Sequence, residues 1–429
     1  MNHFASKTVT SKRSALPLLY LLIVLLLACK SPDALSNAQF WAEDGTVFFA
    51  QQFGHALPQI LVTYAGYLHA IPRLVAWCAQ IAPYQHAPLL FNVFAILIDA
   101  AAILYFAYRM GTFVPLWITI SIFALTPSGG EIFGTLTNVQ WFLQFALFAA
   151  ALLPQRLEER RFLPPWLAIT LPTLVALTGP FSTLIAVVAL PLAALAWMKG
   201  RMGWKCLAPA QEWWVQLDKR ALGAVVAGGL IQALVMAFIG QRQPHGPFEL
   251  SLAKQNVLQG FQYHTFGEIL FSPSVATLFF VCLLLFLVRS AWRSDTAGIV
   301  PVALMLIFAL LQIVSSAHAG PNENLISTTI IWSDRYFFFA KIAFWLCIAC
   351  TLCNLDHSEG NSFAPVVLVL LILVAVLHPG DMRRVPLPDL NWAQESRALR
   401  GAGTSGPVSI PINPVPWRIT VTPKEDTSH

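Results

Sequence analysis

The sequence predicts an all-α membrane protein that crosses the bilayer many times. Of its 429 residues, 57% are hydrophobic and only 11% are charged, and the mean hydropathy is +0.64. Soluble domains usually carry about 25% charged residues. Apolar runs recur along the whole chain, each close to the ~20 residues that a helix needs to cross about 30 Å of hydrocarbon. These observations place the chain among polytopic membrane proteins.

Roughly eleven apolar runs are long enough to be spanning helices. The runs are continuous rather than alternating, which favours helices over the strands of a membrane barrel. A transmembrane bundle is predicted over residues 1–379, and a short extracytoplasmic tail over residues 380–429. The predicted spans cover residues 14–29, 87–108, 112–127, 136–153, 165–179, 181–198, 221–240, 273–290, 297–316, 336–355 and 363–378.

Basic residues predict the orientation of the bundle, because they gather on the cytoplasmic side of short loops. An N-terminus in the cytoplasm places about fourteen Lys and Arg side chains inside and about five outside. The predicted topology is therefore N-in and C-out, in an inner (plasma) membrane. Outward loops long enough to hold structure cover residues 30–86, 241–272 and 317–335. The net charge of +5 comes mostly from the cytoplasmic loops and gives no compact basic surface for nucleic acid.

The cysteines and the N-terminus each allow two interpretations. Basic residues, an apolar run and LLLAC ending at Cys29 are typical of a lipoprotein signal peptide, although Leu27 fits that signal imperfectly. An uncleaved first helix agrees better with the remaining spans. Cys347, Cys350 and Cys353 are spaced by three residues in one apolar run without matching metal ligands, which favours helix packing.

The first outward loop carries an acidic pair, Glu43 and Asp44, in FWAEDG just past the first span. Two helices are predicted to lie in the membrane interface in this loop, one in TVFFAQQF after Asp44 and one from Tyr67. A carboxylate beside low-dielectric lipid can hold a shifted pKa and take a proton from an attacking hydroxyl. We therefore predict that Glu43 or Asp44 is the catalytic base. The alternative is that Asp44 caps the helix that follows it.

A second acid, Glu131, lies in the outward loop between the third and fourth spans, in TPSGGEIFGTLTNVQW. Gly130 and Gly134 permit sharp turns close to a ligand, so Glu131 is predicted to orient the acceptor or a metal ion. Asn138 follows at the outer end of the fourth span. It is predicted to line a substrate cavity, with hydrogen bonding between helices as the alternative. A divalent metal cofactor stays open, and no ligand set is assigned.

Cationic residues complete the predicted site. His69 and Arg73 share one face of the second interfacial helix, and SDRYFFF places Arg335 and Tyr336 at the mouth of the tenth span. Because arginine binds phosphate bidentately, this group is predicted to bind the phosphate of a lipid-linked substrate. The alternative for Arg73 is a snorkelling anchor. Arg335 faces outward against the topology rule, which favours a specific partner.

Two further features have open interpretations. Asp99 lies inside the second span, where an acid is costly, and is either functional or paired with Lys341 across the bundle. In the tail, VSIPINPVPWRITV is predicted to form one or two short strands. The tail either packs on the outer loops near the site or is disordered over much of its length.

With an acidic pair at Glu43 and Asp44, two interfacial helices after it and an acid at Glu131, the chain resembles the GT-C superfamily of integral-membrane glycosyltransferases. The order of elements is similar over roughly the first seven spans. The resemblance implies that a sugar moves, with inversion, from a polyprenyl-phosphate carrier to a glycan, lipid or protein acceptor on the outer face. It also implies that an acid corresponding to Glu43 or Asp44 activates the acceptor, with or without a metal ion.

Two rival functions remain beside glycosyl transfer. A surface-polysaccharide polymerase or ligase would use the same lipid carriers and outer-face acids, and would be expected to have a larger late outer loop than residues 241–272. A transporter or flippase for lipid-linked sugars would favour paired repeats and charges along a midplane path, and few such charges are present. Glycosyl transfer is therefore the leading prediction.

Overall fold

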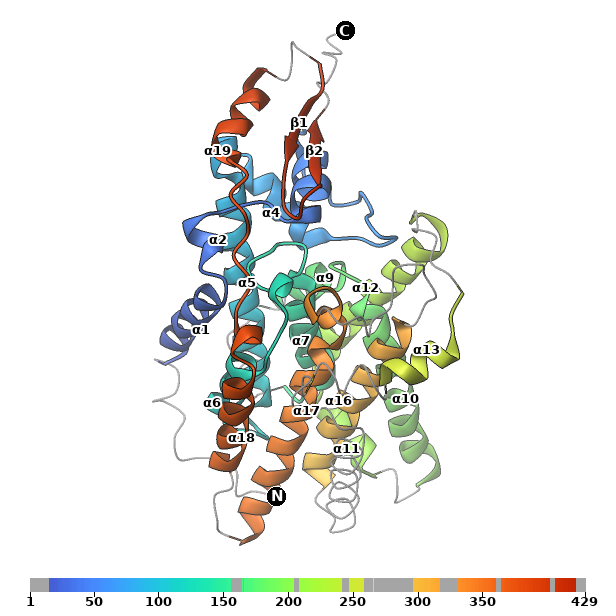
Figure 1. Cartoon of the computed structure of the whole chain (residues 1–429). Helices are drawn as coiled ribbons and strands as arrows, with labels where there is room; N and C mark the ends of the chain where they lie inside the picture. Colours follow the sequence, from blue (N-terminus) through green and yellow to red (C-terminus); the bar gives the residue numbers. More distant parts are fainter. Residues whose placement is uncertain are drawn as a thin grey trace.

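A computed structural model describes most of the chain as a helical bundle with a tail folded onto one end (Figure 1). The described residues are 15–155, 166–203, 208–240, 247–257, 296–316, 330–359, 364–401 and 406–421, together with Pro164 and Thr265. Among them, strands occur only in the tail, as one short hairpin.

Helices lie where the apolar runs predict them. The predicted spans overlap, with bounds that differ by up to about six residues, the helices α1 (Leu16–Lys30), α5 (Ala87–Met110), α6 (Leu116–Leu125), α7 (Val139–Leu152), α9 (Leu167–Ala176), α10 (Phe181–Met202), α12 (Lys219–Phe238), α16 (Thr296–Ser315), α17 (Ile330–Glu359) and α18 (Ala364–Leu377). The span predicted over residues 273–290 lies outside the described residues. Connecting segments form α11 (Ala208–Gln216) and α13 (Leu250–Gln255).

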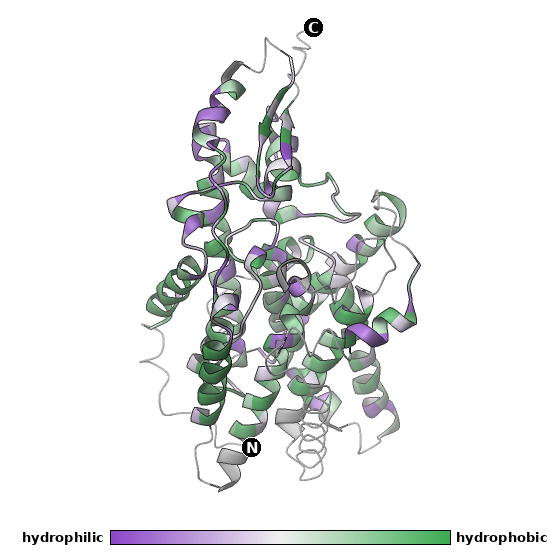
Figure 2. Ribbon diagram, viewed as in Figure 1, coloured by the Kyte–Doolittle hydropathy of each residue, from purple (hydrophilic) through white to green (hydrophobic). Residues whose placement is uncertain are grey.

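Four helical stretches of the described chain are long and apolar enough to cross a membrane: Tyr84–Met110, Phe181–Met202, Lys219–Phe238 and Asp334–Cys353. The other apolar helices are shorter. Figure 2 shows hydrophobic residues along the bundle helices and more hydrophilic residues around α19 and the tail. The apolar helices indicate a membrane-embedded all-α protein.

The core of the bundle is built around α7, whose residues are nearly all buried. This helix packs against α5, α10, α12 and α17. Aromatic rings fill the interior: the centroid of Phe145 lies 5.2 Å from that of Phe106, 4.9 Å from that of Phe123 and 4.7 Å from that of Phe339. Such pairs contribute about 0.5–1.5 kcal/mol each beyond the area that they bury. The residues at the start of α7 are therefore held on a rigid support.

The buried polar groups of the bundle differ in one respect from the prediction. The ammonium of Lys341 pairs with Asp334 on its own helix, at 2.6 Å, and donates to the carbonyl of Pro127. The proposed pairing with Asp99 is therefore wrong. Asp99 lies buried in α5, and within the described part of the chain its carboxyl group has no hydrogen-bond partner. Cys347, also on α17, is buried as a free thiol among apolar neighbours.

The first outer loop contains the short helices that the sequence predicts. After α2 (Asp33–Ser36), a π-helical turn η1 (Asp44–Phe49) continues into α3 (Ala50–Gln52), and α4 covers Ala70–Ala79. The second helix begins at Ala70 rather than Tyr67, because Tyr64 and Tyr67 exchange backbone hydrogen bonds in a tight turn that precedes it. A 3-10 turn, η2 (Tyr84–His86), leads into α5.

The tail is folded and lies on the first outer loop. It contains η6 (Pro379–Met382), α19 (Trp392–Glu395), η7 (Ser396–Gly401) and the antiparallel strands β1 (Val408–Pro411) and β2 (Arg418–Val421). The predicted strands are thus confirmed. Figure 1 shows the hairpin and α19 beside α2 and α4 at one end of the bundle, with α11 at the other end. The first outer loop and the tail, both predicted to face outward, therefore share one end.

Candidate functional site

The carboxylate of Asp44 connects the first outer loop to the start of α7. Its side chain has no exposed surface, and its two oxygens accept backbone hydrogen bonds from Leu136 at 2.9 Å and Thr137 at 2.6 Å. It makes no capping bond to η1, the helix that it begins. The prediction that Asp44 caps the helix that follows it is therefore wrong. Its carboxylate binds a turn 92 residues away in sequence, just before α7.

Burial raises the pKa of Asp44 to about 7, although both backbone N–H groups and the charge of Arg384 favour the ionised form. The negative charge of Glu43 adds to the rise. Because the carboxyl group is enclosed, a substrate hydroxyl cannot reach it without moving the turn at Leu136. The arrangement suits a structural link better than a base that meets substrate.

Glu43 has the more accessible carboxylate of the pair. Its side chain is half-buried, and the hydroxyl of Tyr64 donates to it at 3.0 Å. The charge of Glu43, together with burial, raises the pKa of Tyr64, so this phenol stays protonated and remains a donor. The preceding residue, Ala42, has φ +35°, a left-handed backbone conformation that strains a residue with a Cβ. After this strained residue, the side chain of Glu43 lies beside Tyr64, whereas that of Asp44 is buried against the turn at Leu136.

Glu131 and Arg335 form an ion pair, with Oε1 and Nη1 separated by 3.1 Å. The Glu131 side chain is 3% exposed and the Arg335 side chain 27% exposed, so Arg335 is partly accessible while its counter-ion is covered. Burial raises the pKa of Glu131 to about 7; the charge of Arg335 opposes this rise, and the charge of Glu43 adds to it. The charges of Glu43, Glu131 and Arg335 therefore act on one another.

Aromatic side chains surround this charged group. The guanidinium of Arg335 lies 5.3 Å from the ring of Tyr336, which in turn packs edge-on to Trp141 at 5.3 Å. Burial raises the pKa of Tyr67 to about 12, and the charges of Glu43 and Tyr336 add to the rise. The contact between Tyr336 and Arg335 agrees with their adjacent positions in the sequence.

His69 and Arg73 lie deeper than the prediction places them. Both are buried, and burial with the nearby charge of Arg73 lowers the pKa of His69 to about 3, so its imidazole is neutral. The guanidinium of Arg73 lies 5.4 Å from the ring of Phe48 and has no hydrogen-bonding or ionic partner among the described residues. Burial lowers its pKa to about 10. Arg73 therefore does not share a partner with Arg335.

Asn138 holds the loop that carries Glu131. Its amide nitrogen donates to the carbonyl of Glu131 at 2.8 Å and to the hydroxyl of Thr135 at 2.9 Å. Gly130 leaves room for another part of the chain rather than for a ligand, because a Cβ there would lie 3.1 Å from the Cα of Arg384. Both residues shape the loop, and the tail closes over it.

The structure thus brings together Glu43, Glu131, Arg335 and Tyr336, and assigns Asp44 and Asn138 to the supporting framework. Sequence reasoning missed Tyr64, which carries the clearest contact to Glu43. The only available signal was its position in TYAGY, beside the predicted interfacial helix. Among the described residues, no group of three His, Cys, Asp or Glu side chains is arranged to hold a metal ion.

Comparison of the chain with protein-family models, with curated proteins and with solved structures found no match. The functional argument therefore rests on the geometry of the site.

Proposed function

We propose that the protein is a membrane glycosyltransferase of the GT-C type that takes a sugar from a polyprenyl-phosphate carrier. The observation that carries the proposal is the ion pair between Glu131 and the partly exposed Arg335, with the carboxylate of Glu43 close enough for its charge to act on both. These groups belong to a bundle of apolar helices, where a carrier with a lipid tail and a charged head would be bound.

Each residue has a distinct role in the proposed reaction. Glu43 takes the proton of the acceptor hydroxyl as the oxygen attacks the anomeric carbon, which is general-base catalysis. The bond between that carbon and the phosphate oxygen breaks on the opposite side, so the configuration inverts. Arg335 binds the phosphate that leaves, as guanidinium groups bind phosphate bidentately. Glu131 orients Arg335, and Tyr64 orients Glu43.

The proposal differs from the sequence-based prediction at several residues. Glu131 orients Arg335 rather than the acceptor or a metal ion, and Asn138 holds the loop of Glu131 rather than lining a substrate cavity. Asp44 acts as a framework residue, because its carboxylate is enclosed by the turn before α7. Arg73 lies apart from Arg335 as a second, buried cation. The acceptor is a glycan, a lipid or a protein, and the site faces the outer side of an inner membrane in the proposed topology.

The proposal is tested with purified protein in lipid nanodiscs and a panel of radiolabelled polyprenyl-phosphate sugars. We expect release of polyprenyl phosphate and incorporation of label into an acceptor extract from cell envelopes. Arg335→Met should raise the KM for the donor, whereas Arg220→Met, an exposed arginine at the start of α12, should not. An unchanged KM for the donor in Arg335→Met, or no turnover of any donor in the panel by wild type, would contradict the proposal.

A further inference from the structure

The tail runs between the elements that form the site. The carbonyl of Asp381 accepts the N–H of Ser128 at 2.8 Å, and the N–H of Arg384 donates to the carbonyl of Lys30 at 2.7 Å. The segment that follows α18 is thereby joined both to the loop that carries Glu131 and to the end of α1. In Figure 1 this segment rises along the bundle towards α19.

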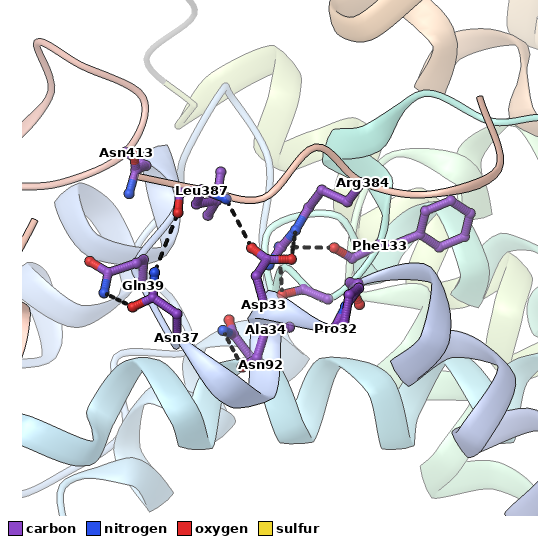
Figure 3. A network of polar contacts seen from close by, with 12 residues as sticks. Pro32, Asp33, Ala34, Asn37, Gln39, Asn92, Phe133, Arg384, Leu387 and Asn413 are labelled. Carbon is purple, nitrogen blue, oxygen red and sulfur yellow. Dashed lines mark hydrogen bonds and ion pairs between the residues drawn. The ribbon is translucent and has the colours of Figure 1, made fainter. Parts of the chain in front are cut away.

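The side chain of Arg384 is buried at the centre of these contacts (Figure 3). Its Nη2 donates to Asp33 at 2.7 Å, and its Nη1 donates to the carbonyl of Phe133 at 3.1 Å. A longer contact of 3.4 Å reaches the carbonyl of Gly134. The planar guanidinium therefore joins α2 to the turn before α7, which a single ammonium cannot do with the same geometry.

The same turn is held from its other side by the acidic segment. Arg384 binds the carbonyl groups of Phe133 and Gly134, while Asp44 binds the N–H groups of Leu136 and Thr137. The guanidinium of Arg384 thus holds the carbonyl groups of this short turn, and the carboxylate of Asp44 holds its N–H groups. Any displacement of this turn moves Glu131, which precedes it by two residues.

The hairpin of the tail holds the acidic segment itself. The carbonyl of Asn413 accepts the N–H of Ala42 at 2.5 Å, and the N–H of Asn413 donates to the carbonyl of Phe40 at 3.2 Å. A Cβ at Gly45 would lie 2.8 Å from the side chains of Ile412 and Ile419, so a larger residue there would require both isoleucines to shift. Residues on both sides of Glu43 are therefore in direct contact with the tail.

We propose that the folded tail is a working part of the site and that Arg384 is a positioning residue. It fixes the loop of Glu131, whose carboxyl group pairs with Arg335, relative to the segment that carries Glu43. The effect on sugar transfer rests on the proposed function, whereas the effect on the position of the loop does not.

Hydrogen–deuterium exchange in lipid nanodiscs tests the positional part. Arg384→Met removes the guanidinium hydrogen-bond donors of Arg384. Arg383→Met is the matched control, because Arg383 is the adjacent arginine and is exposed. We expect Arg384→Met to accelerate exchange by about tenfold in peptides from residues 40–46 and 128–138 and to leave α10 and α12 unchanged. Arg383→Met should behave as wild type.

Unchanged exchange over residues 128–138 in Arg384→Met, or an equal rise throughout the protein, would overturn the proposal. If Arg384→Met does not fold, Arg384→Lys is used in its place, because lysine keeps the positive charge but lacks the planar set of guanidinium donors. This variant should show the same localised rise at smaller amplitude, and wild-type exchange would again overturn the proposal.

Sugar transfer separates this inference from the proposed function. We expect Arg384→Met to lower kcat more than it raises KM, with partial rescue by Arg384→Lys. If wild-type protein transfers no sugar while the exchange result is as expected, the proposed function fails and the role of the tail stands. If wild type transfers sugar while exchange in Arg384→Met is unchanged, the role of the tail fails and the function stands.

Discussion

Replacing Glu43 and Asp44 separately by the corresponding amides should have different effects, one on sugar transfer and the other on stability. Glu43→Gln keeps an oxygen that accepts from Tyr64, and the side chain is only half-buried. We therefore expect its stability to stay within about 0.5 kcal/mol of wild type. Sugar transfer should fall by about 10²–10⁴, the usual contribution of a general base.

Asp44→Asn should act mainly on stability. One amide oxygen can still accept from Leu136 or Thr137, but the NH₂ group then faces the other backbone N–H in a site with no exposed surface. An unpaired buried donor costs about 1–3 kcal/mol. Removal of the negative charge offsets part of this loss of folding free energy, because burial already disfavours the ionised form of Asp44. We therefore expect a net loss at the lower end of this range, about 1 kcal/mol.

Two measurements decide between the roles. Thermal unfolding is followed by intrinsic tryptophan fluorescence in detergent, and initial transfer rates are corrected for the folded fraction. Glu395→Gln, an exposed acid in α19, is the control for both. Loss of transfer in Asp44→Asn at unchanged Tm, combined with full activity in Glu43→Gln, would refute the assignment and identify Asp44 as the base.

Further predictions concern the other buried charges. Arg73→Met should unfold at the same or a higher temperature without ligand, because the buried guanidinium has no ionic partner; a fall in Tm would contradict this. Lys341→Met should destabilise by about 3–5 kcal/mol by removing the counter-ion of Asp334, and Asp334→Asn in the same chain should restore part of the loss on thermal unfolding. Burial raises the pKa of Glu131 from 4.5 to about 7, so the folded state binds more protons than the unfolded state in this range. Stability should therefore fall as pH rises from 4.5 to 7, by about 3 kcal/mol from this group, and Glu131→Gln should flatten that part of the denaturation profile.

The helical fold was predictable because the length of an apolar run reports directly on its membrane setting. Each described run contains a helix near the predicted bounds. The helices of the first outer loop were also predictable, since apolar and polar residues alternate there with helical spacing. The start of α4 was missed by three residues, because the preceding turn is set by backbone bonds between Tyr64 and Tyr67.

The partners of the charged residues were far less predictable. Asp44 binds backbone N–H groups, which every segment of the chain offers, so the sequence contains no signal for Leu136 as its partner. Arg383 and Arg384 are adjacent and chemically identical, yet one is exposed and the other buried against Asp33. Only the path of the tail distinguishes them, and that path depends on packing between segments that lie more than 300 residues apart.

The placement of the acidic pair explains why one residue can serve the framework and its neighbour the site. The strained backbone at Ala42 and the contact with Asn413 fix the direction of the chain before Glu43. Asp44 then turns inward to the N–H groups before α7, and Glu43 is left beside Tyr64. Because Asp44 already satisfies that turn, Glu43 can keep an accessible carboxylate without a structural duty. The inward carboxyl group of Asp44 thus leaves Glu43 available for the reactive role that we propose for it.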